Sequence, residues 1–346
     1  MVESQIVTVA SLLGTVEAIF TRAGLGAAQA GPLARVIVAG ERDACKAHGL
    51  YRIEGVLRTV KAGKVEARAV PDLLPSDGSA VVRVEARHGF TGPAFELGLP
   101  VLVERTRALG VAALVINDGA HFSALWPEIE ALTTHGLAAL AMCPSYAAVA
   151  PAGGSQPLLG TNPFAFGWPR RGPTPYVFDF ATSVAARGEI ELKRRAGAPL
   201  PDGWALDAAG HPTTDPQAAL DGAMLTFGGH KGSAISTMIE LLAGVMIGDL
   251  TSAESLRQLG TTSLSPSHGE LILAFAPERF AAGRPGDPLA RAETLFDAML
   301  GQGARLPSQR RFEARDRALR DGITLTAAEA AQLRRFAEHG LDAVTL

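Results

Sequence analysis

Cysteine is scarce in this chain: its two copies, Cys45 and Cys143, lie far apart and form no CxxC pair. This spacing indicates neither a disulfide framework nor a zinc site, and it fits a reducing compartment, so we expect a cytoplasmic protein. An excess of charge of one sign is also missing, because 32 basic and 35 acidic residues leave a net charge of −3. A nucleic-acid-binding surface would show a basic patch or stripe, so we expect no nucleic-acid partner and favour a small molecule.

Long apolar runs are absent as well, so we expect no membrane partner. The most apolar segment, residues 234–250, falls short of the ~20 apolar residues that a bilayer requires, and four polar residues interrupt it, Ser236, Thr237, Glu240 and Asp249. We expect a buried helix there. The N-terminus has no positively charged region, and Glu17 interrupts the apolar stretch that follows. It is therefore expected to form the first helix of the mature protein rather than a signal peptide.

Motifs that would reveal a metal or a nucleotide are missing too. There is no HExxH and no carboxylate cluster with ligand spacing, so we expect no catalytic metal. No G-x-G-x-x-G follows a predicted strand, and residues 228–233 lack the spacing of a P-loop. What remains there is Gly228 and Gly229 with Lys231 and Ser233 at a helix start. This is either a general anion site or a tight turn with a solvated lysine.

The apolar pattern predicts an α/β protein with room for two domains in its 346 residues. Apolar runs at 111–117 and 137–143 predict two buried strands, and residues 127–135 between them carry helix start and stop signals. A strand–helix–strand crossover predicts parallel strands. Further strands are expected at 80–84, 176–180 and 270–276, and helices in the first forty or so residues and at 93–109, 289–300 and 326–339.

The loop at residues 118–127, between the first of these strands and its helix, is expected to hold a ligand. It contains His121, Phe122 and Trp126. In open α/β sheets ligands bind beyond the carboxyl ends of the strands, near the partial positive charge of a helix N-terminus. The alternative is an ordinary connecting loop whose aromatic residues belong to the core.

Four further positions are candidates for chemistry on a small acid. His48 is suited to passing a proton, and Arg52, four residues later, to holding a carboxylate by two parallel hydrogen bonds. Asp179 ends an apolar strand, where a carboxylate could orient an imidazole, and the basic stretch Arg305–Arg311 could grip a phosphate. The structural alternatives are a His-Arg pair without a catalytic role, a cap on the following turn and the solvated face of a basic helix.

Taken in order, these segments resemble the malate/L-lactate dehydrogenase type 2 superfamily of NAD(P)-dependent oxidoreductases over nearly the whole chain. The segments that carry the resemblance are His48-Gly49 with Arg52, His121-Phe122, residues 151–163 ending in Gly-Thr-Asn-Pro, Val177–Ser183, Gly228–Gly232 and Arg305–Arg311. The resemblance implies a non-Rossmann NADPH-binding domain on a mixed or antiparallel sheet, residues 117–285. It also implies a helical and α/β domain for substrate binding and dimerisation, built from residues 1–116 and 286–346, and a homodimer.

The resemblance also implies roles for individual residues. His48 and Asp179 are the implied catalytic residues, and Arg52 and Thr161 the implied substrate contacts. The implied cofactor is NADPH, with NADH as an alternative, and arginines would meet the 2′-phosphate. Its implied contacts are His121, Phe122, Ser123, Ala124, Leu125, Thr161, Asp179, Phe180, Ala181, Arg187, Gly188, Gly229, His230, Lys231, Arg305, Arg310 and Arg311.

Residues 121–127, His-Phe-Ser-Ala-Leu-Trp-Pro, are similar to one subgroup of the superfamily, which reduces Δ1-piperideine-2-carboxylate and Δ1-pyrroline-2-carboxylate. This resemblance implies reduction of a cyclic imino acid to L-pipecolate or L-proline, with His48 as proton donor. Subgroup members have a serine before this histidine in a Ser-His-Asp relay, whereas this chain has Ala47. We therefore expect the proton to pass through His48 and Asp179, or through a water molecule. The alternatives are a 2-hydroxyacid dehydrogenase acting on malate, lactate or ureidoglycolate, and a weakly active cofactor-binding protein.

Overall fold

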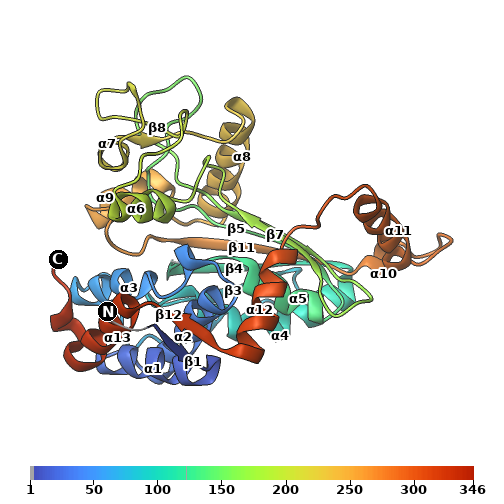
Figure 1. Ribbon diagram of the computed structural model, residues 1–346. Coiled ribbons are helices and arrows are strands. Elements are labelled where there is room, and N and C mark those ends of the chain that lie inside the picture. Colours follow the sequence, from blue (N-terminus) through green and yellow to red (C-terminus); the bar gives the residue numbers. More distant parts are fainter. Residues whose placement is uncertain (1–3, 122) are drawn as a thin grey trace.

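A seven-stranded mixed sheet lies at the centre of the computed structural model, which describes residues 4–121 and 123–346 (Figure 1). In spatial order its strands are β2 (Asp72–Leu73), β3 (Val81–Glu85), β4 (Val111–Ala120), β11 (Ser267–Phe275), β5 (Ala138–Met142), β6 (Phe164–Trp168) and β7 (Tyr176–Phe180). β3 and β4 are parallel, and the remaining neighbours are antiparallel. The mixed sheet confirms the expected fold class.

The predicted crossover is present, with one difference. β4, helix α5 (Trp126–Thr134) and β5 follow one another as expected, and β4 and β5 run in the same direction because each pairs antiparallel with β11. They are not neighbours, however, since β11 inserts between them. An apolar run records that a strand is buried but not which strand lies beside it, so the local pattern could not reveal this insertion.

Helices cover both faces of the sheet. On one face, α4 (Thr91–Leu109) and α5 place Leu102 and Ile129 in one core with Leu114 of β4. On the other face, α8 (His230–Glu240) and the π-helical turn η2 (Leu241–Val245) pack Ile239 and Ala243 against the sheet. The sheet is therefore buried between two helical layers, as its nearly continuous apolar strands require.

The segment at residues 234–250 differs from the fully buried helix that its composition predicts. One side is buried, but the other side is exposed, with exposed fractions of 39%, 53%, 58% and 59% for Met238, Leu241, Val245 and Met246. Apolar content alone does not distinguish a helix buried on every side from one with an open apolar face. In the part of the chain that the structure describes, we find no helix with the length and apolar character needed to span a bilayer.

The two chain ends pack together into one helical unit on one side of the sheet (Figure 1). β1 (Gln5–Val7) pairs antiparallel with β12 (Ile323–Leu325), and Phe20, Ile53 and Phe336 share one core. The helices of this unit are α1 (Val9–Arg22), α2 (Ala27–Arg42), η1 (Lys46–His48), α3 (Arg52–Lys61), α12 (Gln309–Asp321), α13 (Ala327–His339) and η3 (Gly340–Ala343). A helical unit made from both ends is confirmed, whereas the domain boundaries stay a prediction, and the one at 116/117 falls inside β4.

A second, smaller unit lies on the opposite side of the sheet in Figure 1. It contains a three-stranded sheet and short helices: β8 (Ala205–Leu206), β9 (Pro212–Thr213), β10 (Ala223–Met224), α6 (Arg187–Ala196), α7 (Pro216–Asp221) and α9 (Ser252–Leu259). The remaining helices project from the end of β11 and are α10 (Pro277–Phe280) and α11 (Pro288–Gly301).

Candidate active site

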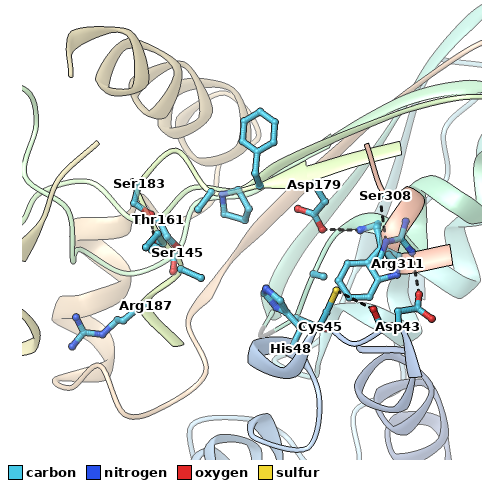
Figure 2. Close-up of a pocket in the computed structure, with 18 of the residues that line it drawn as sticks. Asp43, Cys45, His48, Ser145, Thr161, Asp179, Ser183, Arg187, Ser308 and Arg311 are labelled. Atoms are coloured by element: carbon cyan, nitrogen blue, oxygen red, sulfur yellow. Dashed lines mark hydrogen bonds and ion pairs between the residues drawn. The ribbon is translucent and has the colours of Figure 1, made fainter. Parts of the chain in front are cut away.

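A cleft of about 1050 Å³ is lined by residues of the chain-end unit, the sheet and the smaller unit together (Figure 2). It gathers most of the site residues that the sequence predicts. Those that line it are His48, Arg52, His121, Ser123, Ala124, Thr161, Asp179, Phe180, Ala181, Arg187, Arg305, Arg310 and Arg311.

The other predicted cofactor residues lie outside the lining. Gly188 packs against the turn before α3, where an added Cβ would lie 3.3 Å from the Tyr51 ring and 3.6 Å from Ala47. Gly229, His230 and Lys231 are exposed at the start of α8, after a turn in which Gly228 and Gly229 have φ values of 56° and 59°. The cofactor contacts of these residues stay a prediction. Leu125 belongs to the core, and Phe122 lies outside the described residues.

The backbone of His48 is held against α2 at a distance that glycine alone permits. A Cβ at Gly40 would lie 2.4 Å from the His48 carbonyl oxygen, and a Cβ at Gly49 would lie 2.2 Å from Oε2 of Glu41. The same Glu41 oxygen accepts a hydrogen bond of 3.1 Å from the Leu50 N–H. These contacts fix the turn from which the His48 side chain enters the cleft.

The imidazole of His48 is neutral. Burial, followed by the positive charge of Arg52, lowers the pKa of His48 to about 3. Its Nδ1 has no hydrogen-bond partner among the described residues. The ring meets Trp126 edge-on, with centroids 6.0 Å apart and planes at 89°. The site thus contains a neutral imidazole whose Nδ1 forms no hydrogen bond with another described residue.

Arg52 begins α3 and lines the same cleft. Its Nε donates a hydrogen bond of 2.6 Å to the carbonyl oxygen of Ala47, and its guanidinium lies 5.5 Å from the centre of the Tyr51 ring. Burial lowers the pKa of Arg52, but a guanidinium stays charged in proteins. A buried positive charge in a cleft suits a small anionic ligand, and a carboxylate best matches its planar shape.

Asp179 caps a helix rather than the turn that follows its own strand. Its Oδ2 accepts hydrogen bonds from the N–H groups of Leu125 (2.8 Å) and Trp126 (3.0 Å) at the start of α5. Burial raises the pKa of Asp179 to about 6, although both backbone bonds oppose the rise. Among the described residues no hydrogen bond joins Asp179 to His48, and the catalytic pairing of the two stays a prediction.

Thr161 is positioned by a buried polar network around its neighbour Asn162. The Asn162 amide nitrogen donates to Oγ of Ser236 at 2.9 Å and to Oε1 of Glu240 at 2.8 Å, and its amide oxygen accepts from the Ser252 hydroxyl at 3.0 Å. Every polar group of the Asn162 side chain is thereby satisfied. Such a network is rigid, so it holds the Thr161 wall of the cleft in place.

The basic stretch at residues 305–311 divides into two kinds of arginine. Arg311 is buried, donates to Oδ2 of Asp43 at 3.0 Å, forms an ion pair with Glu130 and lies 4.9 Å from the Trp126 ring centre. Arg305 and Arg310 line the cleft and are exposed. The exposed pair is therefore better placed than Arg311 to meet a phosphate.

Sequence reasoning missed several lining residues. Asp43 gave no signal, because its partner Arg311 lies 268 positions away. Cys143 and His268 also line the cleft, and Glu270 is completely buried beside them. The polar residues His268 and Glu270 lie in the first half of β11, before its apolar residues 271–275, and these two residues were the available signal.

Comparison with known proteins agrees with this arrangement. Residues 7–334 match the malate/L-lactate dehydrogenase family. A Delta(1)-pyrroline-2-carboxylate reductase of Agrobacterium fabrum is 69% identical over 345 residues, which is 100% of both chains. A Delta(1)-pyrroline-2-carboxylate/Delta(1)-piperideine-2-carboxylate reductase of Pseudomonas aeruginosa is 58% identical over 296 residues, covering 86% of this chain and 88% of the relative.

The fold comparison points the same way. The crystal structure of delta1-piperideine-2-carboxylate reductase from Pseudomonas syringae superposes with a TM-score of 0.91 at 38% identity, covering 96% of this chain and 99% of that one. The resemblance predicted from the sequence, including its reductase subgroup, is confirmed. The family implies an oxidoreductase with a nicotinamide cofactor. This chain belongs to the malate/L-lactate dehydrogenase family.

Proposed function

We propose that this protein reduces Δ1-pyrroline-2-carboxylate, Δ1-piperideine-2-carboxylate or both to the cyclic amino acids L-proline and L-pipecolate, with NADPH as reductant. The observation that carries the proposal is the meeting of Arg52 and His48 in one cleft with His121, residues 123–124 and residues 179–181. The names of the relatives support the substrate class. One buried cation for a carboxylate, beside one imidazole for a ring nitrogen, fits a small cyclic imino acid.

The cleft is chemically suited to a nicotinamide dinucleotide. Its volume of about 1050 Å³ is large enough for a cofactor and a small acid together. Two of its polar atoms, His48 Nδ1 and Ser123 Oγ, are buried without a partner among the described residues. Buried polar atoms are normally hydrogen-bonded, so these two are expected to pair with bound molecules. Bound NADPH supplies hydride to the imine carbon.

In this proposal the negative charge of the substrate carboxylate allows His48 to take up the proton that it donates. The positive charge of Arg52 is one cause of the low pKa of His48, after burial. A substrate carboxylate on Arg52 neutralises that charge, so the pKa of His48 rises when substrate binds. The imidazole then holds a proton that it passes to the imine nitrogen as the ring is reduced. Asp179 acts indirectly by fixing the start of α5, and therefore Trp126, against which His48 packs.

NADPH is preferred over NADH in this proposal because exposed arginines line the outer part of the cleft. Arg305 and Arg310 are exposed and form no ion pair with another described residue, whereas Arg311 is engaged by Asp43 and Glu130. A 2′-phosphate is a doubly charged anion that guanidinium groups bind well. The preference should therefore depend on Arg305 and Arg310.

The proposed activity is tested by following oxidation of reduced nicotinamide with several substrates in parallel. We expect turnover with the pyrroline or the piperideine carboxylate and faster turnover with NADPH than with NADH. Oxidation of malate, lactate or ureidoglycolate with no reduction of either imine would overturn the proposal in favour of a 2-hydroxyacid dehydrogenase. Tight NADPH binding without turnover of any of these would show a cofactor-binding protein.

The proposed homodimer uses the open apolar face of α8 and η2, which lies within residues 117–285 and not in the chain-end domain that the resemblance implies for dimerisation. Met238, Leu241, Val245 and Met246 expose this face in the single chain, and contiguous apolar surface of this kind marks a protein interface. We expect light scattering to show a dimer for the wild-type chain and a monomer for Leu241→Glu. The matched control is Leu158→Glu, which alters a leucine of similar exposure outside α8 and η2. A monomeric wild type, or a dimeric Leu241→Glu variant, would contradict this interface.

A further inference from the structure

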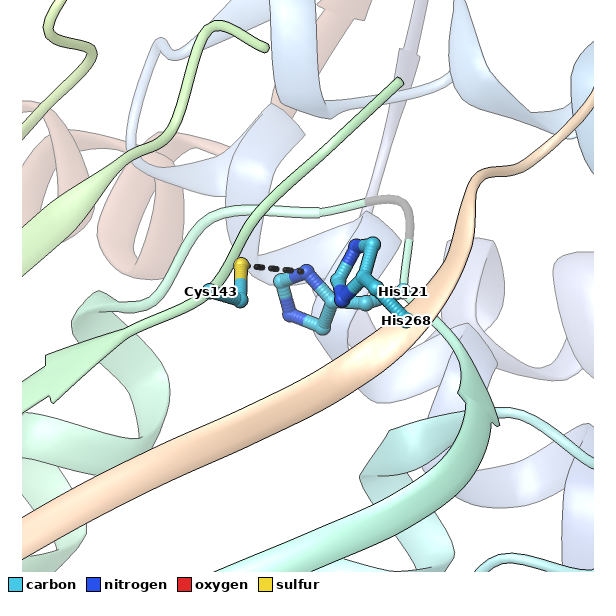
Figure 3. A group of neighbouring side chains, drawn as sticks. All are labelled: His121, Cys143 and His268. Carbon is cyan, nitrogen blue, oxygen red and sulfur yellow. Dashed lines mark hydrogen bonds between the residues drawn. The ribbon is translucent and has the colours of Figure 1, made fainter. Parts of the chain in front are cut away.

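Three neighbouring strands bring two histidines and a cysteine together at one edge of the sheet (Figure 3). β4 and β5 end at this edge, so His121 and Cys143 follow directly after them, and β11 begins here with His268 near its start. The backbone N–H of His121 donates a hydrogen bond of 3.1 Å to the Pro266 carbonyl oxygen. This bond holds the end of β4 beside the start of β11. The cluster is thus a consequence of the insertion of β11 between β4 and β5.

The three side chains have the spacing of metal ligands. One nitrogen or sulfur atom from each of His121, Cys143 and His268 lies within 4.8 Å of the other two. Sγ of Cys143 is 3.8 Å from Nδ1 of His121. The corresponding S···N separation in a tetrahedral zinc site is about 3.5 Å, from Zn–S and Zn–N lengths of about 2.3 and 2.0 Å. Small side-chain rotations would complete the geometry.

His268 already has the tautomer that a metal requires. Its Nδ1 lies 2.8 Å from the Gly269 carbonyl oxygen, which is an acceptor, so Nδ1 carries the proton. The lone pair is therefore on Nε2, free to bind a cation. A metal-ligating histidine is commonly oriented in this way, by a carbonyl group that takes its other N–H. The irregular register of β11 between His268 and Glu270 helps to orient the ring.

A second, independent observation also points to a missing cation. Glu270 is 0% exposed, and neither of its carboxylate oxygens has a hydrogen-bond partner among the described residues. Oε2 of Glu128 is also buried and has no hydrogen-bond partner among them. Oxygen atoms of Glu128 and Glu270 lie within 4.8 Å of a His121 ring nitrogen. Buried carboxylates normally have a hydrogen-bond, ionic or metal partner. A divalent cation beside His121 would supply one.

We propose that His121, Cys143 and His268 form a binding site for a thiophilic divalent metal ion such as Zn²⁺, with Glu270 as the neighbouring charge-balancing carboxylate. A thiolate and a carboxylate together neutralise the two charges of the ion. Access is available because all three ligands line the cleft. The sequence predicts no metal site here because the ligands come from three separate segments. The site is not assigned to catalysis, and the proposal does not depend on the substrate of the enzyme.

The test is titration of the metal-free protein with Co²⁺, followed by displacement with Zn²⁺ against a chelating dye. We expect one ion per chain and the intense near-ultraviolet absorption of a cobalt–thiolate bond. Cys143→Ser should abolish this band and weaken Zn²⁺ binding by more than about 100-fold. Replacing a residue that only hydrogen-bonds to a metal ligand already lowers metal affinity by about 10- to 100-fold, and losing a ligand should cost more. His268→Gln should weaken binding to a similar degree.

Cys45→Ser is the matched control, because Cys45 is the other cysteine and also lines the cleft. It should keep the cobalt band and the Zn²⁺ affinity. Circular dichroism and thermal unfolding show whether each variant is folded. No thiolate band in the wild type, a band that persists in folded Cys143→Ser, or one lost in Cys45→Ser would each overturn the proposal. Failure of imine reduction would leave these readings unaffected, because none of them uses substrate.

Discussion

The imidazole of His48 meets the indole of Trp126 edge-on, and the backbone N–H of Trp126 donates a hydrogen bond to Asp179. The catalytic pairing of Asp179 with His48 that the resemblance implies stays a prediction. In the structure the carboxylate holds the first turn of α5, and the Trp126 ring of α5 packs against His48. The two residues are therefore linked through a helix terminus, and their substitutions should have different signatures.

Replacing His48 should slow turnover without loosening the cofactor. General acid catalysis contributes about 10²- to 10⁴-fold, so His48→Ala should lower kcat by a factor in that range and leave the Kd for NADPH within about twofold of wild type. Steady-state kinetics and fluorescence titration of NADPH measure the two quantities. Unchanged turnover would remove His48 from the mechanism.

The pH profiles should separate the free enzyme from its substrate complex. With a pKa of about 3, after burial and the Arg52 charge have lowered it, His48 is neutral in the free enzyme across the assay range. Hence kcat/KM should show no titration of His48 between about pH 5 and 9. Substrate raises this pKa, so kcat should fall as pH rises through the new value, and His48→Gln should lack that fall. An inflection of His48 in kcat/KM near its ordinary pKa would contradict the structure.

Arg52 should control substrate affinity. A hydrogen bond to a charged group contributes about 1.5–3 kcal/mol, so Arg52→Met should raise KM for the imino acid by about 10- to 150-fold. The Kd for NADPH should change little. Arg52→Lys, which keeps the charge but not the two-pronged geometry, should show a smaller rise in KM. Equal KM values in wild type and Arg52→Met would place the substrate carboxylate elsewhere.

The two kinds of arginine at residues 305–311 should respond differently to substitution. Arg310→Ala should raise the Kd for NADPH about tenfold or more and leave the Kd for NADH unchanged, because it removes a contact to the 2′-phosphate alone. Arg311→Ala removes one buried partner of Asp43 and Glu130, both of which keep Arg315. It should lower the free energy of unfolding by about 1.5–3 kcal/mol, the contribution of a hydrogen bond to a charged group. Cofactor titrations and chemical unfolding measure these two effects. A loss of stability in Arg310→Ala, or a loss of NADPH affinity alone in Arg311→Ala, would contradict this division.

Asp179 should make stability depend on pH. Its pKa is raised from 3.8 to about 6, mainly by burial, so the folded protein holds this proton more tightly than the unfolded chain. The resulting stabilisation is complete below about pH 4 and is lost as pH rises through about 6, a change of about 3 kcal/mol. Asp179→Asn keeps a cap for α5 but cannot ionise. Unfolding free energies of wild type and variant should therefore diverge across this window; parallel curves would argue against the raised pKa.

Local patterns predicted most elements because apolar periodicity and capping residues act over a few positions. The capping box of Thr326 and Glu329 and the helix beginning at Trp126 are examples. Contacts between distant segments were invisible to such reasoning. The sequence near β11 does not show which strands it pairs with, because an apolar strand can pair with many others. In the same way, the sequence near Asp43 does not show that Arg311 is its partner, because many arginines could pair with it.

The sequence predicted those site residues whose type and neighbours along the chain already indicate a chemical role. It did not predict the residues that reach the site only through the fold. His48, Arg52 and the loop around His121 stand out because their residue types are unusual for their positions. Cys143 directly follows the apolar strand β5, and His268 lies near the start of β11, so only the strand order makes them neighbours. The open apolar face of α8 and η2 was missed because composition does not record which side of a helix meets solvent.

The insertion of β11 also determines when this protein can finish folding. A ribosome releases the chain from its N-terminus, so β4 and β5 emerge long before the strand that must join them. Until residues 267–275 are available, both strands expose unpaired edges, and such edges are prone to aggregation. Contacts of such long sequence separation slow folding. The central sheet is therefore completed late in synthesis, and the chain-end unit, which needs β12 and α13, later still.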